Sequence, residues 1–229
     1  MSMKQERNNM KILSVETSGK VCAVAVTEDN NLIKEELIED ENTHSVKLMP
    51  LIDKLLKETN ISIKDIDLFA CDIGPGSFTG IRIGVSTIKA FLDVTNQKAV
   101  GVSALEILTE NVKKDGIVCS LIDAKNENVY CGIFEKRQND CKQIEELKFD
   151  NINNIIKFVK NINKRIIFVG DGSTAYKNKI ESELENAEVL QENTLSAKYI
   201  GNIAFRKKEQ AVDTNNLKPM YLRKSNAER

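Results

Sequence analysis

The sequence has no tryptophan, three prolines and a single histidine, His44, in 229 residues. With one histidine, two-histidine metal sites of the H-E-x-x-H kind are excluded, and any Ser-His-Asp triad must use His44. The five cysteines are odd in number and no pair has C-x-x-C spacing, so neither a disulfide framework nor a zinc knuckle is indicated. We expect buried, reduced thiols and a cytoplasmic protein.

An excess of one charge and a long apolar run are also missing. The 33 Lys and Arg residues balance 34 Asp and Glu residues, which leaves a formal net charge of -1. Proteins whose main activity is to bind nucleic acid without a partner depend on a basic surface. The balanced charge therefore disfavours that activity. No run approaches the roughly 18 apolar residues of a membrane helix, and the polar start predicts no signal peptide. The 41% of hydrophobic residues is enough for a packed core.

Apolar runs and turn residues predict a repeated order of elements. Strands are predicted at 11–15, 21–26, 32–38, 68–73 and 99–102, and helices at 44–59, 77–94 and 104–113. This order, βββαβαβα, repeats between residues 117 and 208, and the polar stretch 111–116 marks the seam. The duplication predicts an α/β protein with two lobes, residues 1–110 and 111–229, each a mixed sheet with helices on its faces.

The segment from Asp72 to Gly84 joins a strand, a Gly-Pro-Gly turn and a helix. Free backbone N–H groups at such a helix start can cradle an anion. The glycine spacing, however, is one residue longer than the dinucleotide fingerprint, and the P-loop pattern is absent. Gly76, Gly80 and Gly84 share one helix face. Packing against the protein's own sheet, a subunit interface and a phosphate site all remain open for this row.

The two helices of the first half carry more apolar surface than one sheet face can cover. Apolar residues of the helix at 44–59 span an arc of roughly 160°, whereas a surface helix needs about 100°. This excess predicts an interface with another subunit, and a larger intramolecular core is the alternative. The residues expected at the partner interface are Val46, Leu48, Met49, Ile52, Leu55, Leu56, Phe78, Gly80, Ile81, Gly84, Thr87 and Phe91.

Three carboxylates, Glu16, Asp72 and Asp123, each end a predicted strand. Side chains in this position commonly bind metals or water in α/β proteins, and turn capping explains them equally well. His44 lies at the start of a predicted helix, where we expect a capping or surface residue.

Several of these segments, taken in order, resemble the bacterial TsaB (YeaZ) family. The segments are Ile12–Ser18, His44–Ser45, Gly74–Gly84, Asp123–Tyr130 and Pro219–Arg223. The string G-P-G-S-F-T-G-[IL]-R-[IL]-G, at Gly74–Gly84, is specific to that family, and the other segments support it.

The resemblance implies a two-lobed fold of the actin, hexokinase and Hsp70 (ASKHA) type. It also implies a role in making the threonylcarbamoyl modification of the adenosine next to the tRNA anticodon. In that role the chain is a scaffold that pairs with the catalytic subunit TsaD through the two first-lobe helices, and the assembly engages the ATPase TsaE. The isolated chain is expected to form a homodimer and to meet tRNA through the complex. Degenerate remnants of a nucleotide site are expected at Glu16, Thr17, Ser18, Gly74, Gly76 and Ser77.

Two departures from related sequences bear on catalysis. The first strand ends in Glu16, where the family usually has aspartate. The catalytic relative holds its metal with two histidines four residues apart, whereas here Leu48 follows His44 at that spacing. A single ligand cannot fix a catalytic metal, so we expect no catalytic residue, metal or cofactor in this chain. The alternatives are an autonomous small-molecule kinase of the same fold and a glycoprotease-like metallopeptidase, which the histidine count disfavours.

Overall fold

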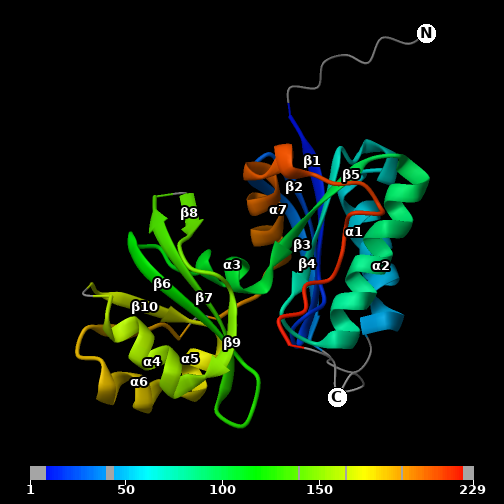
Figure 1. Ribbon diagram of the computed structural model, residues 1–229. Coiled ribbons are helices and arrows are strands. Elements are labelled where there is room, and N and C mark those ends of the chain that lie inside the picture. Colours follow the sequence, from blue (N-terminus) through cyan, green and yellow to red (C-terminus); the bar gives the residue numbers. More distant parts are fainter. Residues whose placement is uncertain (1–8, 40–43, 139, 163, 192, 224–229) are drawn as a thin grey trace. The chain divides into compact units, whose positions relative to one another are not determined.

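The structure, a computed structural model, describes residues 9–39, 44–138, 140–162, 164–191 and 193–223. The polar start at 1–8, for which no signal peptide is predicted, lies outside the described residues. The chain forms two compact units (Figure 1). The first unit contains the described residues up to Val102 together with Leu195–Pro219. The second contains the described residues of Ser103–Thr194 and residues 220–223.

The first unit is built on a sheet of strand order β3-β2-β1-β4-β5. The strands are β1 (Lys11–Glu16), β2 (Val21–Glu28), β3 (Asn31–Glu39), β4 (Leu68–Gly74) and β5 (Lys98–Ser103). β1 runs antiparallel to β2 and parallel to β4. The carboxyl ends of β1 and β4 therefore meet at one edge of the sheet.

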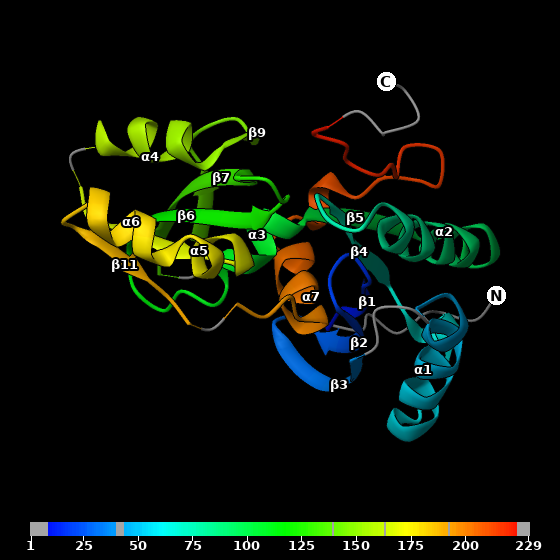
Figure 2. The same ribbon diagram turned by 90° about the horizontal axis from the view of Figure 1, so that it is seen from below.

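Helices cover both faces of this sheet. Figures 1 and 2 show α1 (His44–Thr59) and α2 (Phe78–Thr95) on one face and α7 (Ala197–Arg206) on the other. Alternate strand positions such as Leu13 and Val15 form one core cluster with α1 and α2. Ala23 and Ala25, which point the other way, pack with the start of α7. The short 3₁₀ turns η1 (Ile63–Asp65) and η2 (Lys208–Gln210) complete this unit.

The second unit has a sheet of order β11-β10-β6-β7-β8, with β9 also paired to β7. The strands are β6 (Gly116–Asp123), β7 (Asn128–Arg137), β8 (Asp140–Gln143), β9 (Lys148–Asn151), β10 (Ile166–Val169) and β11 (Ala187–Val189). The helices are α3 (Ala104–Thr109), α4 (Ile152–Lys160), α5 (Asp171–Ala175) and α6 (Lys177–Glu183). Among the described residues, no helix combines the length and apolar character needed to cross a membrane.

The predicted order of elements holds for the first half and holds with two changes for the second. β8 and β9 stand where one strand is predicted, and α5 and α6 where one helix is predicted. The loop between β8 and β9 breaks the pairing with β7, and Tyr176 separates the two helices.

The lobe boundaries at 110 and 111 differ from the two observed units, because each sheet recruits a helix from the other half of the sequence. α7 packs on the first sheet, where Ser14 Oγ donates a hydrogen bond of 2.7 Å to the Ala197 carbonyl oxygen. α3 belongs to the second unit, where the buried Lys136 Nζ donates a 2.8 Å bond to the Thr109 carbonyl oxygen at the helix end. Pairing of elements distant in sequence therefore sets the units, rather than the polar seam at 111–116.

Candidate functional site

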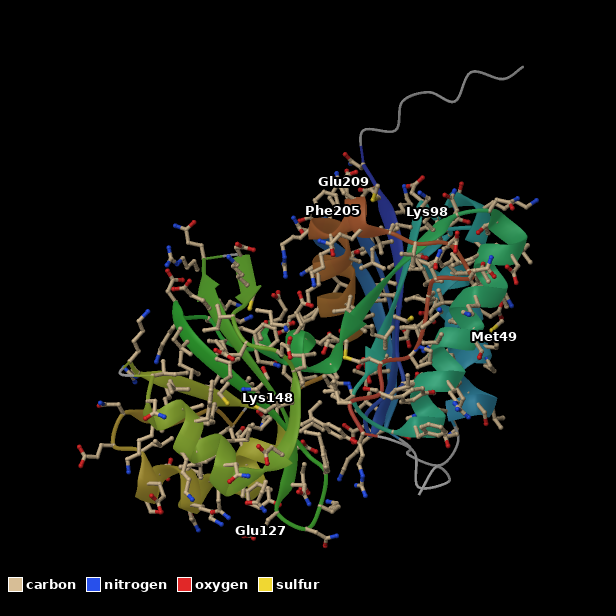
Figure 3. All side chains as sticks on the ribbon, in the orientation of Figure 1. Met49, Lys98, Glu127, Lys148, Phe205 and Glu209 are labelled. Atoms are coloured by element: carbon tan, nitrogen blue, oxygen red, sulfur yellow. The ribbon has the colours of Figure 1, made fainter. Side chains whose placement is uncertain are left out.

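Apolar side chains of α1 and α2 reach solvent at three of the predicted interface positions. Val46 is 72% exposed, Met49 50% and Phe78 39%. Figure 3 shows Met49 on the side of the helices away from the sheet. The two helices pack against each other, so we treat these three residues as one feature and call it the α1–α2 surface. Exposed apolar side chains on two helices that pack together are a candidate site of association.

Arg82 extends this surface, although the sequence argument did not place it there. Its guanidinium carbon lies 3.8 Å from the centroid of the Phe78 ring. The two residues are four apart on α2, and that spacing brings side chains together on a helix. Arginine stacked on an aromatic ring is a pairing often found at binding hot spots. The spacing was visible in the sequence and could have identified Arg82.

Most of the other predicted interface residues lie in the core of the first unit. Leu48, Ile52, Leu55 and Ile81 are fully buried in the cluster that α1 and α2 form with the sheet. Leu56, Thr87 and Phe91 are half-buried, and the Phe91 ring stacks on Phe69. The prediction that Leu48, Ile52, Leu55 and Ile81 bury against a partner is wrong, because the sheet takes up most of the wide apolar arc.

The glycine row of α2 faces the turn after β1, not a neighbouring subunit. A Cβ atom at Gly80 would overlap the Thr17 carbonyl oxygen. A Cβ at Gly84 would lie 2.5 Å from Thr17 Oγ1, and one at Gly76 would lie 2.7 Å from the Ser18 carbonyl oxygen. The absence of side chains thus lets α2 approach its own sheet. The assignment of Gly80 and Gly84 to a partner interface is wrong.

The carboxyl groups at the ends of β1 and β4 accept hydrogen bonds from the turns that follow, as the capping reading of these residues expects. Glu16 Oε1 accepts hydrogen bonds from the N–H groups of Ser18 (2.7 Å) and Gly19 (3.0 Å). Asp72 Oδ1 accepts one from the Gly74 N–H at 2.6 Å. Both carboxyl groups are buried, and the Ser18 hydroxyl lies between them. In the second unit, Asp123 accepts in the same way from the Lys125 N–H at 3.0 Å.

Burial has a strong electrostatic effect on this cluster. It raises the pKa of Glu16 well above the usual value, and the neighbouring Asp72 raises it further through charge repulsion and hydrogen bonding. Burial also raises the pKa of Cys22 to about 11, with a further contribution from the Glu16 charge.

The predicted nucleotide-site remnants come together at this turn, but their hydrogen-bond donors face the protein. The N–H groups of Ser18 and Gly19 are taken by Glu16. The Ser77 N–H donates to the Ser18 carbonyl oxygen (2.8 Å), and the Gly80 N–H to Ser77 Oγ (3.2 Å). A phosphate group would have to displace these internal acceptors, so this turn does not fit a phosphate.

His44 begins α1 and is buried, so the expectation of a surface position is wrong. Within the described residues, its Nε2 atom has no hydrogen-bond partner.

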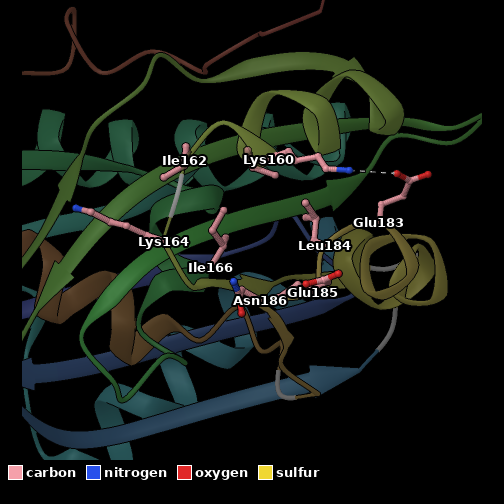
Figure 4. A pocket seen from close by; sticks show the side chains of 10 residues that line it. Lys160, Ile162, Lys164, Ile166, Glu183, Leu184, Glu185 and Asn186 are labelled. Carbon is pink, nitrogen blue, oxygen red and sulfur yellow. Dashed lines mark ion pairs between the residues drawn. The ribbon is translucent and has the colours of Figure 1, made fainter.

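A separate cavity of about 230 Å³ lies in the second unit between α4, β10 and the segment after α6 (Figure 4). Apolar side chains such as Ile162, Ile166 and Leu184 line it. Lys160 and Glu183 form a 4.0 Å ion pair at its side. None of the predicted site residues lines this cavity.

Comparisons with known proteins agree with the sequence resemblance. Residues 33–229 match the protein family described as TsaD, tRNA N6-adenosine threonylcarbamoyltransferase. The tRNA threonylcarbamoyladenosine biosynthesis protein TsaB of Bacillus subtilis is 28% identical, over 96% of each chain.

Solved structures show the same fold. YeaZ from Pseudomonas aeruginosa superposes with a TM-score of 0.78 at 20% identity, covering 93% of this chain and all of that one. The activator of 2-hydroxyisocaproyl-CoA dehydratase from Clostridium difficile superposes with a TM-score of 0.51 at 9% identity, covering 88% and 96%. The predicted ASKHA fold class is therefore confirmed.

Proposed function

The chain belongs to the TsaB (YeaZ) branch of the TsaD family, and we propose that it serves tRNA threonylcarbamoyladenosine biosynthesis as a non-catalytic subunit. In this proposal it binds and supports the TsaD-type catalytic subunit. Because the chain belongs to this family, the proposal also includes an ATPase of the TsaE type in the assembly.

The α1–α2 surface is the observation that carries the proposal. Val46, Met49 and Phe78 are exposed on helices whose residues Leu48, Ile52, Leu55 and Ile81 are fully buried. A catalytic subunit of the same family would present equivalent helices, and packing of the two pairs would remove these side chains from water. In isolation, the same surface would pair with a second copy of the chain.

The turn after β1 supports a non-catalytic role. Its donors are bonded to Glu16, Ser18 and Ser77, which weighs against the kinase alternative because a kinase must hold phosphate groups. The metallopeptidase alternative would need more metal ligands of the histidine type than His44 supplies.

Reconstitution of the modification tests the proposal. The purified chain alone should transfer no threonylcarbamoyl group to tRNA, whereas adding it to the TsaD-type subunit and the TsaE-type ATPase should give modified tRNA. Mass spectrometry of tRNA nucleosides measures the product, and reactions that omit one protein at a time are the controls. Turnover by the chain alone, or full turnover without it, would refute the proposal.

Direct tRNA binding by the isolated chain should be weak. The basic clusters of the sequence, at 206–208 and 223–224, are short, and the total charge is balanced. We expect a Kd of about 10⁻⁵ M at physiological salt, within the range of non-specific phosphate contacts, and a shallow salt dependence. Fluorescence anisotropy with labelled tRNA measures both. A submicromolar Kd with a steep salt slope would show that the chain has a tRNA site of its own.

A further inference from the structure

The Ser18 hydroxyl lies within hydrogen-bond distance of two buried carboxyl groups. Its oxygen is 2.9 Å from Glu16 Oε1 and 2.6 Å from Asp72 Oδ2. A hydroxyl carries one proton and can donate it to one acceptor. If both carboxyl groups were ionised, one of these short oxygen–oxygen contacts would have no proton between its atoms, next to two like charges shielded from water.

We propose that Glu16 and Asp72 hold one proton between them at neutral pH, and that this proton fastens the turn after β1 to the start of α2. In one arrangement, protonated Asp72 donates to Ser18 Oγ, and Ser18 donates to Glu16 Oε1. In the other, protonated Glu16 donates from Oε1 to Ser18 Oγ, and Ser18 donates to Asp72 Oδ2.

The same turn makes the contacts that position α2. The Ser18 carbonyl oxygen accepts the Ser77 N–H at 2.8 Å, directly before the helix. Thr17 Oγ1 donates to the Gly80 carbonyl oxygen at 2.8 Å. Gly76 leaves no space between its Cα atom and Ser18. Repulsion between two ionised carboxylates would therefore act on the junction between β1 and α2.

Two buried thiols and three residues without an ionisable side chain lie near the pair. The thiols of Cys22 on β2 and Cys71 on β4 are buried, and burial together with the nearby carboxylates raises the pKa of each. The α2 side contributes Gly76 and Ser77, and Leu195 contacts Gly19 from the segment before α7. These three residues carry no ionisable side chain.

The sign of the pH effect follows from the raised pKa of Glu16. Below the unfolded-state pKa, both states hold the proton, and stability does not change with pH through this group. Above that value, the unfolded chain releases the proton while the folded chain keeps it. Stability must therefore fall with rising pH until the folded protein also loses the proton.

Thermal and chemical unfolding of Glu16→Gln at a series of pH values tests this. A glutamine amide supplies the donor permanently, so the variant should lose this pH dependence. The unfolding equilibrium constant of the wild type should rise, relative to the variant, by up to tenfold per pH unit between the two pKa values. Glu39→Gln, at an exposed position, is the matched control and should leave the pH dependence unchanged. If the free energy of unfolding changed with pH in the same way for the wild type and for Glu16→Gln, the proposal would be overturned.

Two measurements on the wild type do not depend on the variant folding. Infrared spectroscopy at neutral pH should show a buried carboxylic-acid carbonyl band, and Asp72→Asn should remove it. Hydrogen exchange of the Ser77 amide should accelerate with pH by more than intrinsic base catalysis explains. Absence of the acid band at neutral pH would overturn the shared proton. If the Ser77 amide exchanged only at its intrinsic rate while the carboxyl pair ionised, the proposed coupling between the pair and α2 would be overturned.

Discussion

Replacing Gly80 by alanine is expected to destabilise the first unit severely. The added methyl group would overlap the Thr17 carbonyl oxygen, and a backbone atom cannot move aside as a flexible side chain can. Overpacking of a filled interior commonly costs about 1–3 kcal/mol, and a backbone clash at a helix–turn contact should cost at least about 3 kcal/mol. Denaturant unfolding followed by circular dichroism measures the loss.

Ser86→Ala is the matched control for this change. Ser86 is exposed on the same helix, so alanine there has no contact to disturb and should leave the unfolding free energy within about 0.5 kcal/mol. Gly84→Arg should also unfold the unit, because its Cβ would lie 2.5 Å from Thr17 Oγ1. A folded Gly80→Ala protein of wild-type stability would show that α2 does not contact the turn in this way.

Charged substitutions on the α1–α2 surface should abolish tight pairing while leaving the fold intact. Val46 and Met49 are exposed, so glutamate at either position costs little in the isolated chain. At an interface, the carboxylate would have to leave water without a partner. Each change should weaken binding to the TsaD-type subunit by about 2 kcal/mol, or roughly 30-fold, and the double change by more.

Calorimetry measures the affinity for the catalytic subunit, and light scattering measures the homodimer. Leu37→Glu is the control, because Leu37 is an exposed apolar residue of the same unit on β3, outside the α1–α2 surface. Modification activity in the reconstituted system should fall with the affinity and recover at high subunit concentration. If Val46→Glu, Met49→Glu and Leu37→Glu all bound the catalytic subunit with wild-type affinity, the α1–α2 surface would not be the interface.

Local patterns in the sequence predicted much of the fold. Short apolar runs and turn residues predicted the order of the first half, and α4 (residues 152–160) and β10 (residues 166–169) lie within the predicted repeat between residues 117 and 208. The Gly-Pro-Gly turn predicted the start of α2, where Ser77 caps the helix by accepting the Gly80 N–H. These features depend on neighbours within a few residues, so the sequence alone determines them.

Apolar periodicity did not determine which neighbour each helix face meets. Leu48 and Met49 are adjacent apolar residues of α1, yet one is in the core and the other in solvent. The sequence showed that Gly80 and Gly84 share one helix face, but the turn that packs against this face comes from residues more than sixty positions earlier. An apolar arc favours burial in general, and it carries no information on whether a sheet or another subunit provides the contact.

Tertiary structure also decided the units and the chemistry of the turn. α7 joins the first sheet because Gly201 fits against Thr27 and Ser14 bonds to Ala197, contacts between residues more than 170 positions apart. Glu16 and Asp72 were recognised as strand-end carboxylates, but parallel pairing of β1 with β4 places them on either side of Ser18. The sequence thus determined the local elements and the family. Long-range packing alone decided which residues are core, which remain exposed on α1 and α2, and which two carboxyl groups are buried together, because these depend on approach between distant segments.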